Sequence, residues 1–95
     1  MTLVLLAGAC KKADEPTTSA IITGYDRQLC ACCGGLMINF QGETRPYTGD
    51  FKLFENGADV GISNTQVFPL YVKVDYVTLT KCAGRYIKIT KLKRQ

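Results

Sequence analysis

The sequence contains no histidine and no tryptophan, and only eight of its 95 residues are aspartate or glutamate. Without histidine, Ser-His-Asp and Cys-His catalytic arrangements cannot form, and most hydrolytic zinc sites are excluded as well. No two carboxylates are placed so that a glycosidase pair could be argued, and no glycine-rich phosphate loop is present. The composition therefore favours a nonenzymatic protein.

Long hydrophobic runs are missing too. No stretch of about 18 apolar residues occurs, so the sequence predicts no transmembrane helix. A chain of 95 residues allows one small domain, whose core is expected to need additional covalent stabilisation. The net charge of +4 is modest and does not by itself indicate nucleic acid, which is not expected as a partner.

The sequence does contain short segments in which apolar residues alternate with polar ones, as in strands with one buried face. They cover Ala20–Tyr25, Leu36–Phe40, Phe51–Phe54, Leu70–Leu79 and Tyr86–Lys91. Within the last two segments, the residues expected to face inward are Leu70, Val72, Val74, Tyr76, Ile87 and Ile89. Glycine-rich turns separate the segments, and no window carries a capped helical stripe. Residues 20–95 are therefore predicted to form an all-β domain of five or six mainly antiparallel strands, either a small barrel, with the OB type as one candidate, or a sandwich.

The first ten residues differ in kind from the rest, because an apolar run ends in small residues directly before Cys10. The stretch Leu6-Ala7-Gly8-Ala9-Cys10 resembles the lipobox of bacterial lipoproteins, and Lys11-Lys12-Ala13-Asp14-Glu15 is similar to the Lys-plus-acidic tether of Bacteroidetes-type lipoproteins. The resemblance implies a signal peptide over residues 1–9 and a lipidated Cys10 that begins a flexible tether over residues 10–19. A signal peptide normally opens with a positively charged segment, and no Lys or Arg precedes Lys11, so on this interpretation the true start is expected upstream of Met1. In the alternative interpretation, residues 2–9 are a buried element of the domain.

The lipoprotein resemblance also implies a location. Acyl chains on Cys10 would anchor the protein to the bacterial outer membrane, with the β domain facing the periplasm or the cell surface. No hydrophobic segment of the domain would then need to contact lipid.

Four cysteines remain if Cys10 carries lipid, and an even number in a small exported domain favours disulfides. Bridges between Cys32 and Cys33 or between Cys30 and Cys32 would be strained, so Cys30–Cys33 with Cys32–Cys82 is the least strained complete set. The second bridge would close a loop of about fifty residues, for which the chain-entropy model gives roughly 4 kcal/mol as an upper estimate.

Two alternatives use the same cysteines. The stretch Cys30-Ala31-Cys32-Cys33-Gly34 contains a C-x-x-C-G spacing, so Cys30, Cys32, Cys33 and Cys82 are candidate thiolate ligands for zinc or copper. The same Cys30-x-x-Cys33 pair is a candidate thiol-redox centre, although a strand-like run follows it where a redox enzyme would place a helix.

Half of the twelve basic residues lie in the last fifteen positions. The basic strip formed by Lys88, Lys91, Lys93 and Arg94 is a candidate docking site for an anionic partner. Alternatively, lysines on the exposed face of a last strand prevent edge-to-edge aggregation. The function that fits best is a membrane-anchored, disulfide-stabilised binding or envelope-structural module. A thiolate metal-binding or redox protein is the alternative.

Overall fold

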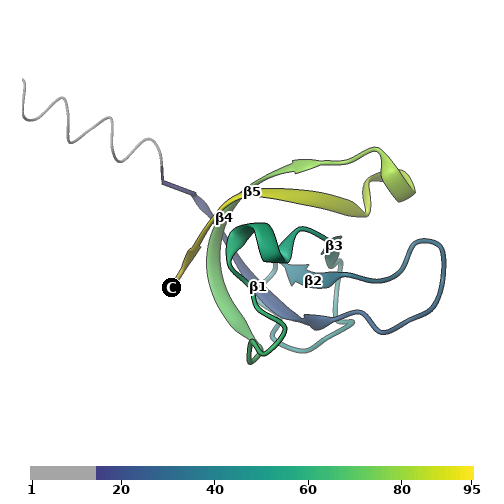
Figure 1. Cartoon of the computed structure of the whole chain (residues 1–95), viewed down its shortest axis with the longest axis horizontal. Helices are drawn as coiled ribbons and strands as arrows, with labels where there is room; N and C mark the ends of the chain where they lie inside the picture. Colours follow the sequence, from purple (N-terminus) through teal and green to yellow (C-terminus); the bar gives the residue numbers. More distant parts are fainter. Residues whose placement is uncertain (1–14) are drawn as a thin grey trace, which may run out of the picture.

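The computed structural model describes residues 15–95, which form five strands and two short 3-10 turns (Figure 1). The strands are β1 (Thr18–Tyr25), β2 (Leu36–Asn39), β3 (Lys52–Phe54), β4 (Leu70–Thr78) and β5 (Tyr86–Arg94). The turns are η1 (Gly57–Val60) and η2 (Lys81–Gly84). All five strands overlap segments predicted from the alternating pattern, and the all-β fold class is confirmed. β1 begins at Thr18, inside the predicted tether over residues 10–19, and β5 extends three residues beyond Lys91.

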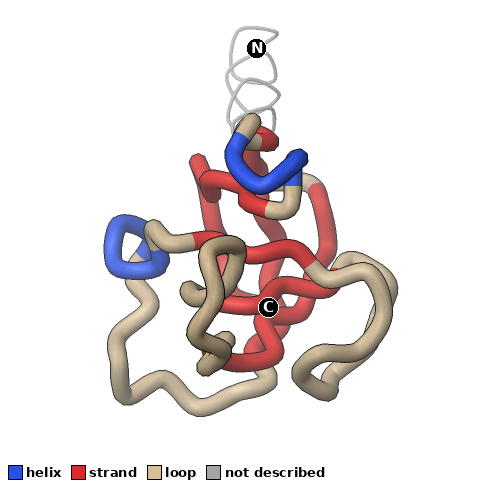
Figure 2. Tube along the Cα trace, turned by 90° about the vertical axis from the view of Figure 1, so that its right-hand side faces the viewer, coloured by secondary structure: helices blue, strands red, loops and turns tan. Residues whose placement is uncertain are grey.

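The strands close into a barrel in the order β1-β2-β3-β5-β4, so the barrel alternative is confirmed over the sandwich. Four of the five pairings are antiparallel, and β3 runs parallel to β5 through Leu53↔Tyr86 and Phe54↔Ile87. This arrangement corresponds to an OB-type barrel, with η1 in the connection between β3 and β4. Figure 2 shows the strands in the centre, with loops and turns around them.

The barrel interior, called here the inner core, is an apolar cluster to which all five strands contribute. Its buried members are Ala20, Ile22, Leu36, Ile38, Phe54, Ile62, Val72, Val74, Ile87 and Ile89. The inward prediction is correct for Val72 and Val74 but wrong for Tyr76, which is 38% exposed. The β4–β5 register shifts between Asp75 and Tyr76, and such a shift changes the face to which the following side chains point.

A second apolar cluster lies on the outer side of the same barrel wall. This outer cluster consists of buried Met37, Leu53 and Tyr86, with partly buried Phe51, Leu79 and Cys82 packed against it. Because successive side chains on a strand point to opposite faces, Leu53 points outward where Phe54 points inward. Strands β2 and β3 are therefore buried on both faces, whereas the alternating pattern predicted one exposed face.

The connection from β3 to β4 contains no α-helix, in agreement with its poor helix formers. The Asn56 side chain donates to the Ile89 carbonyl oxygen (2.7 Å) and accepts from the Ile89 N–H (3.2 Å), so it takes the place of a neighbouring strand beside β5. Ile62 then inserts into the inner core. Among residues 15–95, neither helical turn has the length or apolar character needed to cross a bilayer.

Candidate functional site

The segment between β1 and β2, residues 26–35, is called here the cysteine loop because it carries three of the cysteines. Its base is closed by the Asp26 N–H, which donates to the Gly35 carbonyl oxygen (2.9 Å). The Asp26 carboxylate then accepts from the N–H groups of Gly34 (2.9 Å) and Gln28 (3.0 Å). One buried side chain therefore holds both ends of the loop.

Asp26 is also held from outside the loop, by the Tyr47 hydroxyl, which donates to its Oδ1 at 2.9 Å. Burial alone would raise the pKa of Asp26. The hydrogen bonds from Gly34, Gln28 and Tyr47 together outweigh burial, so the pKa of Asp26 lies below its ordinary value. The carboxylate is therefore charged at neutral pH. Its three donors act together to fix the loop.

The loop returns to the barrel through Gly35, where no other residue fits. Gly35 has φ +88°, and a Cβ built on it would lie 2.6 Å from the carbonyl oxygen of Phe54. Both the left-handed backbone and the close approach of β3 require glycine at this position. The Gly34-Gly35 pair, predicted as a turn signal, thus sets the direction in which the loop enters β2.

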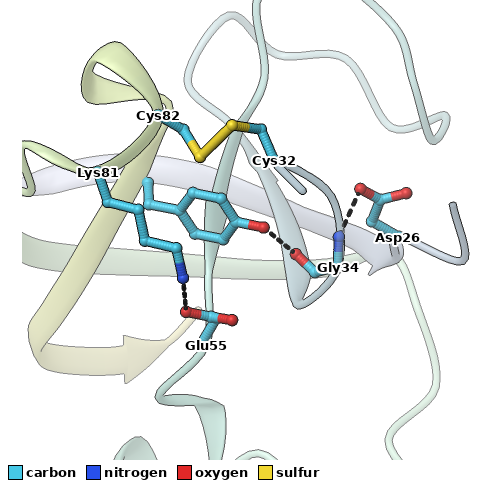
Figure 3. Close-up of polar contacts among 7 residues, drawn as sticks. Asp26, Cys32, Gly34, Glu55, Lys81 and Cys82 are labelled. Carbon is cyan, nitrogen blue, oxygen red and sulfur yellow. Dashed lines mark hydrogen bonds and ion pairs between the residues drawn. A yellow bond between two sulfur atoms is a disulfide. The ribbon is translucent and has the colours of Figure 1, made fainter. Parts of the chain in front are cut away.

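The long-range cysteine pair joins the cysteine loop to the η2 turn. The sulfur atoms of Cys32 and Cys82 lie at disulfide distance, with their Cα atoms 5.7 Å apart and fifty residues between them in sequence (Figure 3). Cys82 and Ala83 both have left-handed backbones, with φ of 53° and 56°. Such conformations are costly for residues with a Cβ and persist where the surroundings impose them.

The local cysteine pair lies within the loop itself. Cys30 and Cys33 are also at disulfide distance, with their Cα atoms 5.0 Å apart. The Cys33 N–H donates to the Cys30 carbonyl oxygen at 3.2 Å, which closes a turn without help from the sulfur atoms. The four cysteines therefore come together in the two pairs that the sequence favoured.

Tyr86 connects the outer cluster to the cysteine loop. Its side chain is buried, and its hydroxyl donates to the Gly34 carbonyl oxygen at 3.1 Å. Burial raises the pKa of Tyr86. The Lys81 ammonium group lies 4.3 Å from the centre of the Tyr86 ring and contacts Glu55 at 2.6 Å, which raises the pKa of Lys81 (Figure 3). The cysteine loop and the η2 turn therefore cover the outer cluster.

A cavity of about 540 Å³ opens beside the cysteine loop and the η2 turn. Its lining includes Asp26, Tyr47, Phe51, Arg85 and the Cys32–Cys82 pair. The Arg85 guanidinium lies 5.1 Å from the centre of the Phe51 ring and donates to the Phe51 carbonyl oxygen at 3.3 Å. The cavity therefore presents both a carboxylate and a guanidinium beside the Cys32–Cys82 pair.

The sequence also predicted a lipidation site and, as an alternative, a set of metal ligands. The lipidation site Cys10 lies outside the described residues. Within residues 15–95, no three side chains of the metal-ligating types converge on one point, so the proposed zinc or copper set is not gathered as a centre. The predicted metal ligands are instead divided between the two sulfur pairs.

The basic strip follows β5, and some of its members already have protein partners. Arg94 donates to the Gly61 carbonyl oxygen (3.1 Å) and to Gln66 Oε1 (2.7 Å), and Lys93 lies 3.5 Å from Glu15. Lys88 is exposed. In the closed barrel, β5 pairs with β4 on one side and with β3 on the other, where the pairing involves Tyr86 and Ile87. The interpretation that lysines on β5 prevent edge-to-edge aggregation therefore applies only to the part of β5 beyond Ile87. An anionic partner for the strip remains a prediction.

Sequence reasoning did not single out Asp26, Tyr47 or Tyr86, which organise the site. Asp26 carried a usable signal, because an aspartate directly after a strand and before a glycine-containing loop often accepts loop N–H groups. The two tyrosines are brought to the loop from 21 and 52 residues away, by Tyr47–Asp26 and Tyr86–Gly34 contacts that no local pattern encodes.

The fold and site define a class of molecule: a small OB-type barrel whose β1–β2 and β4–β5 loops are joined by a cysteine pair. Comparison with known protein families, curated proteins and solved structures gives no match to this chain.

Proposed function

We propose that this protein is a lipid-anchored component of the bacterial envelope, in which a disulfide-stabilised β-barrel acts as a nonenzymatic binding or envelope-structural module. The proposal combines the lipobox-like sequence before Cys10 with the cysteine pairing in the barrel. Disulfides form and persist in oxidising compartments outside the cytoplasm. Both features therefore favour the same location.

The observation that carries the proposal is the pairing of Cys32 with Cys82. It joins two loops fifty residues apart, directly over the outer cluster, to which Cys82 itself contributes. A small domain has limited apolar area to bury, so a covalent link at this position adds stability that packing alone supplies poorly.

A binding role draws on the same region. Asp26 and the Cys32–Cys82 pair fix the loops on either side of the polar cavity, and a fixed loop loses little conformational entropy when a partner binds. By analogy with OB-type barrels, whose strand order this barrel shares, the β1–β2 and β4–β5 loops border the ligand-binding face. The partner is accordingly expected at the rim formed by the cysteine loop and the η2 turn.

The anchor is tested by expressing the full chain in its native host and comparing it with the Cys10→Ala variant. The unaltered protein should sediment with the outer membrane, and mass spectrometry should find acyl chains on Cys10 as the mature N-terminus. The variant should lose both properties, whereas a Ser19→Ala control should keep them. An unmodified Met1 retained on the chain would contradict the anchor.

The disulfide arrangement is tested separately, by counting free thiols and bound metal in protein isolated from that compartment. Four oxidised cysteines in residues 15–95, without stoichiometric metal, are expected. Reduced cysteines with bound zinc or copper would instead establish the thiolate metal-binding alternative.

A further inference from the structure

We propose that the Cys30–Cys33 pair is an exchangeable disulfide that accepts electrons from a dithiol of a partner protein, while the Cys32–Cys82 pair stays closed as the structural link. This activity goes beyond the proposed binding or structural role and does not depend on the lipid anchor. It rests on a difference between the two pairs in what each one holds together.

The Cys30–Cys33 bond holds little that is not held otherwise. It spans three residues, and the turn that it closes already has the hydrogen bond from the Cys33 N–H to the Cys30 carbonyl oxygen. On either side of this turn, the Asp26 carboxylate accepts from Gln28 and Gly34. Opening the Cys30–Cys33 bond therefore leaves the loop in place.

The Cys32–Cys82 bond reaches the packed part of the molecule at one end, because Cys82 is half-buried while Cys32 is exposed. Cys82 packs against the outer cluster, next to Lys81, which contacts both Glu55 and the Tyr86 ring. These contacts keep Cys82 beside Cys32 and raise the effective concentration of one sulfur at the other. A structural disulfide held in this way resists reduction by external thiols.

The exposure of the loop tip suits a protein partner. Cys30 is exposed, whereas Cys33 is half-buried, so the accessible sulfur is that of Cys30. Directly before it, Leu29 is fully exposed and contributes to neither apolar cluster. An apolar side chain beside a reactive sulfur offers a contact by which a partner protein can align its own thiol.

The exchange transfers two electrons from the partner dithiol to the Cys30–Cys33 pair. A thiolate of the partner attacks Sγ of Cys30, the Cys30–Cys33 bond breaks, and its electron pair leaves on Sγ of Cys33, which takes up a proton. The second thiolate of the partner then attacks the partner sulfur in the mixed disulfide, and Cys30 leaves as a thiolate that is protonated in turn. The partner dithiol thus loses two electrons and two protons, and the Cys30–Cys33 pair gains the two electrons and the two protons.

The first test uses the full chain carrying Cys10→Ser, so that every thiol signal comes from the two pairs. The protein is treated with dithiothreitol, quenched by alkylation and analysed by peptide mass spectrometry. Cys30 and Cys33 should become labelled at least about tenfold faster than Cys82, with the near-ultraviolet circular dichroism unchanged. Equal or slower labelling of Cys30 and Cys33, or loss of the tertiary signal as they open, would overturn the proposal.

The site of attack is tested with two single variants in the same Cys10→Ser background. Cys33→Ala leaves the exposed Cys30 thiol, and Cys30→Ala leaves the half-buried Cys33 thiol. With glutathione disulfide, the first variant should form a mixed disulfide several-fold faster than the second. The reverse order would overturn the assignment of Cys30 as the attacked sulfur.

The role of Leu29 is tested by comparing a small dithiol with a protein dithiol. Leu29→Ser should leave the reduction rate with dithiothreitol unchanged and lower the rate with reduced thioredoxin several-fold. An equal effect on both rates, or none on the thioredoxin rate, would overturn the docking role of Leu29. Failure of any of these three tests leaves the anchor and thiol-count results of the proposed function untouched.

Discussion

The inner core and the outer cluster lie on opposite faces of the barrel wall formed by β2, β3 and β5, and they are enclosed by different means. The inner core is surrounded by all five strands, so backbone pairing and apolar packing enclose it together. The outer cluster is covered by loops, among them the cysteine loop and the η2 turn, which are held by hydrogen bonds, an ion pair and a cysteine pair. A loop that cannot form a strand must be fixed through its side chains.

The largest effect is expected in the inner core. Phe54→Ala should lower the free energy of unfolding by about 3–5 kcal/mol, because Phe54 is fully buried and the barrel cannot collapse around the space it leaves. Denaturant unfolding followed by circular dichroism measures this loss. A loss below about 1 kcal/mol would show that the interior is not packed as described.

The cysteine link is expected to come second. In the Cys10→Ser chain, Cys32→Ala with Cys82→Ala should lower the free energy of unfolding by roughly 2–4 kcal/mol, since the cross-link closes about fifty residues of chain. Cys30→Ala with Cys33→Ala is the matched control and should cost about 2 kcal/mol or less, because its ring is short. Equal losses would remove the distinction between the two pairs.

The stability that Asp26 contributes through the cysteine loop is expected to depend on pH. Asp26→Asn should cost about 1–3 kcal/mol at neutral pH, because an amide cannot accept from all three donors at once. The folded-state pKa of Asp26 is lowered, so its stabilisation is present above the unfolded value of about 3.8 and is lost as the pH falls through the folded pKa. Unfolding curves measured from pH 7 to pH 2 should therefore converge for the two proteins at the acid end. A gap that stays constant would contradict the assignment.

A double-mutant cycle separates the two apolar clusters directly. Leu53 and Phe54 are neighbours on β3 that point to opposite sides of the wall. Leu53→Ala should couple to loss of the Cys32–Cys82 link by about 1 kcal/mol, because both act on the outer cluster, whereas Phe54→Ala should be additive with that loss within about 0.5 kcal/mol. Coupling of the same size for both residues would mean that the clusters act as one core.

The smallest effect concerns a single hydroxyl group. Tyr86→Phe keeps the ring in the outer cluster and removes the hydrogen bond to the Gly34 carbonyl oxygen, so it should cost about 1 kcal/mol. Hydrogen exchange of the amide groups in the cysteine loop should rise in the same variant. Unchanged exchange in residues 26–35 would show that Asp26 alone holds the loop.

Strand positions were readable from the sequence because burial of one face leaves a period of two. The alternation places β4 to within one residue and the start of β5 correctly, but β5 continues three residues beyond the predicted end at Lys91. The inward-facing pattern fails at Tyr76, where a shift in register follows Asp75. The outer cluster was missed, because Met37 and Leu53 become buried only when loops distant in sequence fold over them. Continuous apolar stretches such as Leu36-Met37-Ile38 are nevertheless typical of strands buried on both faces.

The cysteines were paired correctly in space by arguing which bridges a short peptide can accommodate, whereas the groups that fix the loops were not foreseen. Asp26 acts through neighbouring N–H groups, and Tyr47 and Tyr86 arrive from distant segments. The parallel pairing of β3 with β5 is equally non-local, and no turn between those strands announces it.

The direction of β1 decides what the molecule displays. The strand begins at Thr18, opposite Val74 of β4, which in turn pairs with Leu92 near the end of β5. The cysteine loop follows the other end of β1, after Tyr25. Eight strand residues span about 25 Å at roughly 3.3 Å each. A barrel held to a surface through the chain before Thr18 would therefore present Leu29 and Cys30 at its far pole, within reach of molecules approaching from the opposite side.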